Sequence, residues 1–577
     1  MRPRLRADVR YVKSSEGVYV RGSAGACTLT GGAAYEWLDR LAPFLTGEHA
    51  LDDLVAPLKS EQRDVVEHLV RSLLDQQLLV DARDDEPHSL TEEEQRVYAP
   101  EIAFLRYATD SAEHRFERLR SARVALVGHG PVLAALLEAG LRSGWRRVEV
   151  CTDDVVPPGA VRDSAQEVVV HTGPPSDPDL LLCVSDRPME LDAKAVGLVL
   201  VGGAEAWVTA VGPPERVVAC TRRLGSLHDS DEDLLTGPVP GIIAAHVALS
   251  CFRHLTGTAA EEPVLTRIDL RDLSARTHRP LPYAFTEPVR TDAVADTDRV
   301  DERLVDERVG VLRALDEDDL PQVPLAVCRA TVSDPEAVLP GWAPLPQVVG
   351  WGVDRDRARW HTALAALATY GSLVDRGGER VDLLTGRPCA MPAVNAQAPY
   401  RAPVGVAAGR SWGDAVAAGL RAHCEALVSR SDEPGRPCDP ETVVRSSGDE
   451  RTVELLRLLR AADVPVEVAD QGDVLGVPAF VFRVAGESVV TCAATAVEAL
   501  RDGLERVLLR RQCGPQAVIT RWVAEGDGLP AADDPRCRSL ATALRRAGRT
   551  VVAVPLVADD AVRERVPCLV RVVVGDD

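Results

Sequence analysis

The sequence predicts a multidomain α/β protein, and three observations favour that class. First, 577 residues are enough for three or four domains, each with a sizeable core. Second, short alternating runs followed by helical patterns fill residues 7–81, as in a winged-helix unit. Third, a continuous apolar strand at 123–127 leads into a glycine turn, a helix and another strand, the opening of a Rossmann-like unit. We expect domains at 1–84, 98–285 and 303–577, the last also α/β.

Charge and composition exclude several classes of protein. The net charge of −22 argues against nucleic acid and anionic membrane surfaces as partners. Because no apolar run approaches twenty residues and no secretion-type stretch follows the basic N-terminus, we expect a cytoplasmic protein. The 13 cysteines are scattered singly with no C-x-x-C pair, which predicts buried thiols rather than disulfides or a four-cysteine zinc site.

The first domain is predicted element by element. Two alternating runs, at 9–13 and 18–21, flank a polar glycine-containing turn, and a third run at 26–30 ends at two glycines. Helical spacing predicts a helix over 33–45, a short one near 51–58, and a third that begins at Ser60 as its N-cap. Residues 78–80 then return to an extended conformation.

This order of elements resembles the PqqD-like domain that recognises leader peptides in the biosynthesis of ribosomally made, modified peptides. The resemblance implies that the third strand has a free edge on which a precursor's leader adds as a further strand. It assigns Cys27, Thr28 and Leu29 to backbone pairing, and Val66, Leu69 and Leu73 on the third helix to an apolar groove.

Two alternatives stand beside this interpretation. The three helix residues could belong only to the core. The winged helix could also bind DNA, but its third helix carries four acidic residues, Glu61, Asp64, Glu67 and Asp75, against two arginines, which disfavours that function.

The second domain carries an incomplete nucleotide signal. Gly128 and Gly130 follow the first strand, but Leu133 occupies the place of the third glycine of G-x-G-x-x-G. The two glycines could cradle a phosphate at the helix N-terminus, although a structural turn explains them better.

The second domain also resembles the E1-like (ThiF-like) fold, and more narrowly the ThiF-like subunit of azole-forming peptide cyclodehydratases. The stretches that carry the resemblance are 210–214, 218–223, 227–228, 242–255, 265–270 and 277–280. Where the family carries C-x-x-C, this chain has Cys220 and Arg223, so we expect zinc to be lost. No Asn-x-x-Arg-Gln follows the second strand, so the adenylation chemistry of that fold has no visible carriers.

The third domain resembles the YcaO superfamily, whose active members use ATP to activate a peptide amide for ring closure. The resemblance is carried by 304–326, 362–370 and 403–425. Family members hold Mg²⁺–ATP with carboxylates on helical faces. Here 365–370 has alanine in place of acids, and only Asp414, Glu425 and Glu505 are possible survivors. Isolated carboxylates are more often surface charges than ligands, so we expect no ATP or Mg²⁺ on this chain.

Together these resemblances predict a non-catalytic, leader-binding scaffold, an accessory subunit with a degenerate YcaO-like domain and no catalytic or metal-binding residues. It would deliver a precursor peptide to a separate YcaO cyclodehydratase that holds ATP and Mg²⁺ and forms azolines from Cys, Ser or Thr, as in thiopeptide biosynthesis. ThiF-like folds commonly dimerise, so a homodimer is also expected. The alternatives are a self-contained ATP-dependent cyclodehydratase and a winged-helix transcriptional regulator.

Overall fold

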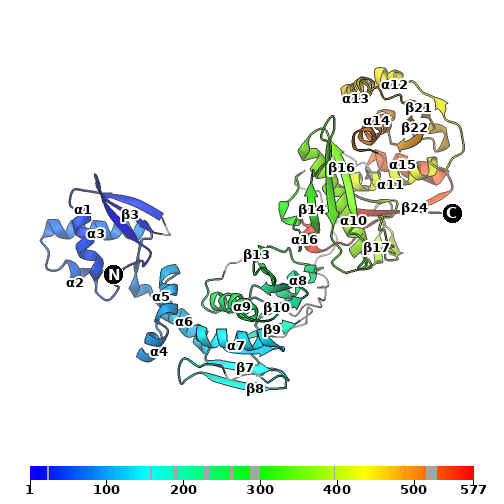
Figure 1. Cartoon of the computed structure of the whole chain (residues 1–577). Helices are drawn as coiled ribbons and strands as arrows, with labels where there is room; N and C mark the ends of the chain where they lie inside the picture. The colour runs from blue at the N-terminus through cyan, green and yellow to red at the C-terminus, as the bar shows by residue number, and fades with distance from the viewer. Residues whose placement is uncertain are drawn as a thin grey trace. The chain divides into compact units, whose positions relative to one another are not determined.

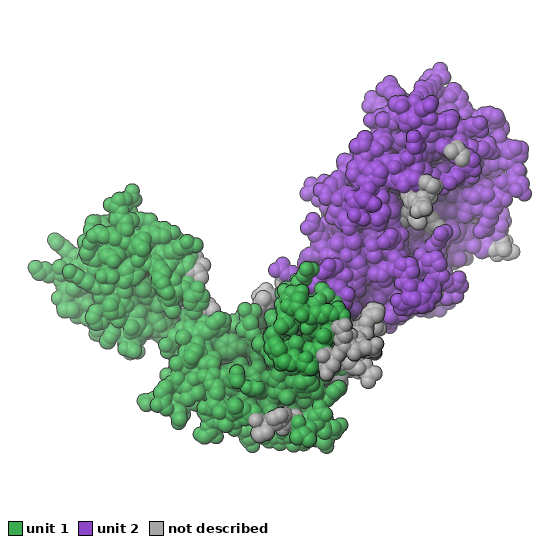
Figure 2. All heavy atoms as spheres, viewed as in Figure 1, with its two compact units in different colours: residues 1–218, 227–277 green, residues 219–226, 278–577 purple. Residues whose placement is uncertain are grey.

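The computed structural model describes residues 1–22, 25–155, 159–185, 193–224, 234–259, 264–285, 299–395, 397–484, 486–514 and 529–576. Residues 227–228, which contribute to the E1-like resemblance, and most of the stretch between the second and third predicted domains lie outside these residues. The chain divides into two compact units, one of residues 1–218 and 227–277, the other of residues 219–226 and 278–577 (Figure 2). Both units mix helices and sheets, which confirms the predicted α/β class.

Unit 1 begins with a small sheet and three helices. The sheet has the order β2-β3-β4, formed by Arg10–Ser14, Gly17–Gly22 and Gly25–Thr30 (Figure 1). The helices are α1 (Ala34–Leu41), α2 (Leu51–Val55) and α3 (Ser60–Asp75). Two details differ from the predictions. The N-cap of α3 is Lys59, whose amide donates to the Gln62 side chain, rather than Ser60. A strand absent from the prediction, β1 (Pro3–Leu5), pairs antiparallel with β5 (Leu79–Asp81).

An eight-stranded sheet forms the centre of the following part of unit 1. Its order is β13-β12-β11-β10-β9-β6-β7-β8, and β8, β7, β6, β9 and β10 run parallel. The strands are β6 (Arg123–Val127), β7 (Arg147–Cys151), β8 (Glu167–His171), β9 (Leu180–Ser185), β10 (Ala195–Gly202), β11 (Glu205–Thr209), β12 (Leu265–Asp269) and β13 (Ala275–His278).

One face of this sheet is covered by α7 (Pro131–Ser143) and α9 (Val239–Leu255), which pack against each other. Three further helices, α4 (Glu92–Val97), α5 (Ala99–Ala108) and α6 (Ala112–Ser121), precede the sheet in the chain. The shared core includes Phe116, Trp145 and the apolar strand residues that the sequence predicts to be buried. Gly140 on α7 is required by this packing, because a Cβ there would lie 1.9 Å from the Trp145 ring.

Unit 2 contains three sheet-and-helix layers. β14 (Leu312–Asp316), β15 (Ala326–Val332) and β16 (Gln347–Gly352) pack on α10 (Arg355–Val374). β19 (Val406–Gly409), β25 (Cys568–Asp576) and β24 (Arg549–Pro555) pack on α11 (Trp412–Val428) and α15 (Pro535–Arg546).

The third layer is the sheet β20-β21-β22-β23, against which α14 (Ala496–Cys513) packs together with α13 (Glu450–Ala461). Its strands are Arg436–Pro437, Glu467–Asp470, Ala479–Val484 and Glu487–Cys492. Shorter elements complete the unit, namely α8 (Pro214–Thr221), which begins in unit 1, β17 (Gly378–Val381), β18 (Pro388–Met391), α12 (Pro440–Ser447) and α16 (Asp560–Arg563). Among the described helices, none is both long and apolar enough to pass through a bilayer.

Candidate functional site

β4 is an edge strand of the first sheet among the described residues. The amide of Gly31 donates to the Glu16 carbonyl, and β3 and β4 continue in that register, with Val18 opposite Leu29. Because hydrogen-bonded pairs alternate along an antiparallel ladder, the backbones of Cys27 and Leu29 face β3 and that of Thr28 faces outward. Of the three residues predicted to pair with a leader, Thr28 therefore presents its N–H and C=O at the free edge.

The residues predicted to line a groove lie in the core. Val66, Leu69 and Leu73 are 0%, 4% and 0% exposed, and they pack in the hydrophobic cluster of the first eighty residues. Their burial matches the alternative that these side chains are structural. On the same helix the apolar side chain of Val65 is 44% exposed and therefore accessible from solvent.

The G-x-G turn after β6 is occupied by the chain itself. The Gly130 amide, at the N-terminus of α7, donates to Asp154 Oδ2 at 2.7 Å. Gly128 has a φ of +139°, and a Cβ there would lie 2.5 Å from the Val184 carbonyl oxygen. The turn thus needs glycine for close packing, and its amide already has an anionic partner. These contacts give the glycines a structural explanation.

Arg223, in the position where the resemblance suggests a zinc-binding cysteine, lies in a buried polar network of unit 2. Its guanidinium donates to Asp559 at 2.7 Å, to the Tyr370 hydroxyl at 3.2 Å and to the Leu281 and Pro282 carbonyls. Tyr370 in turn donates to the other oxygen of Asp559 at 2.6 Å. Burial raises the pKa of the Tyr370 hydroxyl, which therefore remains a donor. Because the Arg223 side chain is itself positively charged, this position is unsuited to binding a zinc ion.

A group of buried charged side chains lies between α11 and α14. Arg421 Nη2 is 2.8 Å from Asp502, and Arg506 is 2.7 Å from the same carboxylate. Arg506 also binds both oxygens of Glu425, at 3.1 and 3.2 Å. Glu505 accepts from Trp351 Nε1 at 3.0 Å and lies 3.6 Å from Arg451 Nε. We call Arg421, Glu425, Asp502, Glu505 and Arg506 the charged cluster.

Burial makes these charges unusually costly to leave unpaired. The side chain of Asp502 is fully buried, and those of Glu425 and Glu505 are each 13% exposed. Burial raises the pKa of both Asp502 and Glu505 above that of a solvated carboxyl group. Burial would lower the pKa of Arg506, but the neighbouring carboxylates Asp502 and Glu425 outweigh it and raise that pKa. Asp502 is thereby suited to fix the two arginines in place.

The structure places the three carboxylates that the sequence suggests as survivors in different surroundings. Glu425 on α11 contacts Arg506 of α14, and Glu505 is the neighbour of Arg506 in the chain. Asp414 instead accepts from Ser411 at the N-terminus of α11 and pairs with Arg536 at 2.7 Å. Sequence reasoning missed Arg421, Asp502 and Arg506. Helical spacing could have indicated part of this group. Glu505 and Arg506 follow Asp502 by three and four residues, so the three side chains share one face of α14.

The donor types of the charged cluster fit Mg²⁺–ATP in kind. Carboxylate oxygens are the ligands that Mg²⁺ prefers, and guanidinium groups match phosphate oxygens. Glu425 and Glu505 would hold the ion, and Arg421 and Arg506 would face the phosphates. Ala365, Ala366 and Thr369 on α10 add no charge, and Thr369 donates to the Ala365 carbonyl within its own helix.

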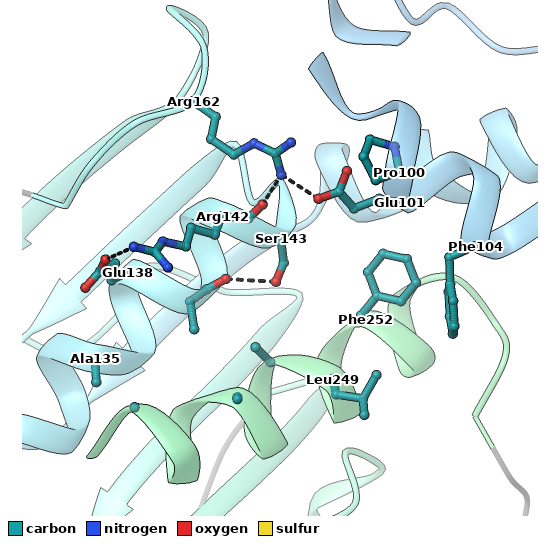
Figure 3. Close-up of a pocket in the computed structure, with 14 residues that line it drawn as sticks. Pro100, Glu101, Phe104, Ala135, Glu138, Arg142, Ser143, Arg162, Leu249 and Phe252 are labelled. Carbon is teal, nitrogen blue, oxygen red and sulfur yellow. Dashed lines mark hydrogen bonds and ion pairs between the residues drawn. The ribbon is translucent and has the colours of Figure 1, made fainter. Parts of the chain in front are cut away.

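A cavity of 810 Å³ lies in unit 1 between α5, α7 and α9 (Figure 3). Phe104, Leu249 and Phe252 form its apolar part, while its rim carries the ion pairs Arg162–Glu101 and Arg142–Glu138. Ser143 donates to the carbonyl of Ala139 on the same helix. The cavity therefore offers apolar contact area, and the groups suited to chemistry lie in the charged cluster of unit 2.

No protein-family model and no curated protein sequence matches this chain. Solved structures do match it. A heterocyclase in complex with substrate and cofactor aligns over 99% of this chain and 94% of its own, with 14% sequence identity and a TM-score of 0.62. The heterocyclase TruD aligns over the same shares, with 12% identity and a TM-score of 0.58. The chain therefore has the fold of these heterocyclases.

This finding corrects the function predicted from the sequence. Both matched proteins are heterocyclases, which are enzymes, and the match extends over nearly the whole chain rather than over a leader-binding part. The prediction of a non-catalytic accessory scaffold is therefore wrong. It depended on counting missing acids on α10 and α11, and it could not detect the carboxylates and arginines that α11 and α14 bring together.

Proposed function

We propose that this chain is a self-contained, ATP-dependent peptide heterocyclase. It would close azoline rings at Cys, Ser or Thr residues of a ribosomally made precursor peptide, with no separate YcaO enzyme. The observation that carries the proposal is the fold shared over 99% of the chain with a heterocyclase solved with substrate and cofactor. The charged cluster supports it, because it supplies carboxylates and guanidinium groups together in one partly buried place.

The reaction that we propose is a cyclodehydration. The side-chain sulfur or oxygen of the core peptide adds to the preceding amide carbon, and the amide oxygen finally leaves. The peptide therefore loses the elements of one water for each ring that forms. ATP, when bound, supplies the phosphoryl group that makes this oxygen a leaving group.

The chain's own residues hold and orient the reactants. Glu425 and Glu505 are the carboxylates for the divalent ion, and Arg421 and Arg506 stabilise negative charge on phosphate oxygens. Asp502 contacts both arginines and limits their freedom, so they are oriented before a ligand arrives.

The proposal includes capture of the precursor by the first domain. The outward N–H and C=O of Thr28 would pair with an extended leader, and exposed Val65 would contact its apolar side chains. Tethering through the leader raises the local concentration of the core peptide, so a modest leader affinity is sufficient.

The direct test incubates the purified full chain with a precursor peptide, Mg²⁺ and ATP, and measures peptide mass. The expected result is an ATP-dependent loss of one water per ring, absent when ATP is omitted. An unchanged mass, with the leader shown to bind, would contradict the proposed activity.

A further inference from the structure

Three side chains of different chemistry meet at the edge of the eight-stranded sheet. Glu149 and Cys151 lie on β7, and His171 lies directly opposite Cys151 on the edge strand β8 (Figure 1). Successive residues of a strand point to opposite faces, and Val148 and Val150 point into the core under α7. Glu149, Cys151 and His171 therefore share the other face, and their ligand atoms all lie within 4.8 Å of one another.

The distances are close to those a tetrahedral ion requires. Bond lengths of about 2.3 Å to sulfur and 2.0 Å to nitrogen or oxygen place such ligand atoms about 3.3 to 3.6 Å apart. Cys151 Sγ lies 3.8 Å from His171 Nε2, and Glu149 Oε1 lies 2.5 Å from the same nitrogen. Because 2.5 Å is shorter than this spacing, Glu149 must move away from His171 Nε2 when the ion binds.

The surroundings of the three residues favour a bound cation. The carboxylate of Glu149 is oriented by Ser176, whose amide and hydroxyl donate to it at 3.0 and 3.2 Å. Such outer contacts typically fix metal ligands. The side chains of His171 and Glu149 are 31% and 22% exposed, so an ion can reach them from solvent.

We propose that Glu149, Cys151 and His171 bind a divalent transition metal of the zinc class. This site is separate from the charged cluster and from the Cys220–Arg223 position. A thiolate, a carboxylate and a neutral imidazole carry two negative charges, which balance a divalent ion, and the mixture of sulfur, nitrogen and oxygen donors suits Zn²⁺. The fourth position would hold solvent.

Binding of the ion changes the protonation of Cys151 and His171 and the contact that His171 makes with Gly173. The Cys151 thiol releases one proton to solvent. The Gly173 amide donates to His171 Nδ1 at 3.1 Å, so the metal-free ring carries its proton on Nε2. That proton must move to Nδ1 as Nε2 takes the metal, and the Gly173 amide then leaves the ring. Metal binding is therefore coupled to a local rearrangement of the 172–176 loop.

Cobalt provides the test, because a thiolate bound to Co²⁺ gives an intense near-ultraviolet charge-transfer band. The chelator-treated full chain, titrated with Co²⁺, should show this band with one equivalent, and Zn²⁺ should displace it. Cys151→Ser should abolish the band. Ser176→Ala should weaken Co²⁺ binding roughly 10-fold to 100-fold, as loss of an outer contact does.

Cys389→Ser is the matched control, because Cys389 is a partly exposed thiol on β18 outside the cluster. It should bind Co²⁺ as the wild type does. If Cys151→Ser does not fold, the partly exposed His171→Gln serves instead, and it should weaken the band. A wild type without the band, or a band that Cys151→Ser and His171→Gln leave unchanged, would overturn the proposal.

Discussion

Arg223 and Asp559 lie 336 residues apart in the sequence, yet their side chains form a 2.7 Å ion pair in which both are almost completely buried. Tyr370 completes the network by bonding to both partners. A buried ion pair is costly to form, but it is costlier to break, because one partner is left with an uncompensated charge.

We predict that Arg223→Met lowers the free energy of unfolding of unit 2 by about 3 to 5 kcal/mol, because it leaves the Asp559 carboxylate buried without its cation. The double variant Arg223→Met/Asp559→Asn should lose less. Chemical denaturation followed by fluorescence measures both. Arg436→Met, which removes an exposed pair with Asp473 in the same unit, is the control and should change little. Equal losses for Arg223→Met and Arg436→Met would contradict the assignment.

The edge of β4 predicts a selective effect on peptide capture. Thr28→Pro removes the outward N–H, so the affinity for a leader fragment should fall by more than roughly tenfold, the equivalent of one lost hydrogen bond to a strand partner. Thr28→Val keeps the N–H and should bind as the wild type does. Fluorescence anisotropy of a labelled leader measures the affinity, and circular dichroism checks that both variants are folded. Undiminished binding by folded Thr28→Pro would exclude the edge of β4 as the leader-binding site.

We predict that a variant of the charged cluster loses ring formation but still binds the peptide. Glu505→Gln removes a proposed ligand of the divalent ion, so ring formation should fall by at least roughly 100-fold, since such a ligand is worth several kcal/mol of transition-state stabilisation. Leader affinity should not change. Glu379→Gln, at an exposed position of β17, is the control. Mass spectrometry measures the rate of water loss. A fully active Glu505→Gln variant would show that Glu505 takes no part in the reaction.

Glu505 also predicts a pH-dependent stability difference. Burial raises its pKa in the folded chain above the unfolded value, so ionisation is less favourable in the folded state. The wild type should therefore lose stability relative to Glu505→Gln as the pH rises through the folded pKa. At pH values below the unfolded pKa, the stabilising contribution of protonated Glu505 is fully present.

Denaturant titrations of both proteins from acidic to neutral pH measure this difference. Tryptophan fluorescence follows the transition, and Trp351 is the tryptophan that contacts Glu505. A stability difference that stays constant over the whole range would show that Glu505 does not titrate in this way.

Local patterns in the sequence were sufficient for the elements but not for the long-range contacts. The alternating runs of the first domain became β2, β3 and β4 within a few residues of the predicted bounds. β1 was missed because a three-residue strand has no pattern of its own and forms only where β5 lies beside it. The resemblance assigns Val66, Leu69 and Leu73 on α3 to a groove, but helical spacing alone does not distinguish groove positions from core positions, and these three side chains are buried.

The candidate site shows the same limit more sharply. Glu425 and Glu505 each look isolated in the sequence because their partners are distant in it. Glu425 contacts Arg506, 81 residues away, and Glu505 contacts Trp351, 154 residues away. Likewise Cys151 and His171 become neighbours only when two strands pair. Neither relationship has a spacing that a linear motif can express.

The pairing of β1 with β5 brings residues 3–5 alongside residues 79–81, so both ends of the first domain lie side by side. A boundary placed after Asp85, whose carboxylate pairs with Arg4, would keep these two strands together. If this domain captures the leader as we propose, transplanting residues 1–85 onto a heterocyclase should transfer leader binding to the recipient.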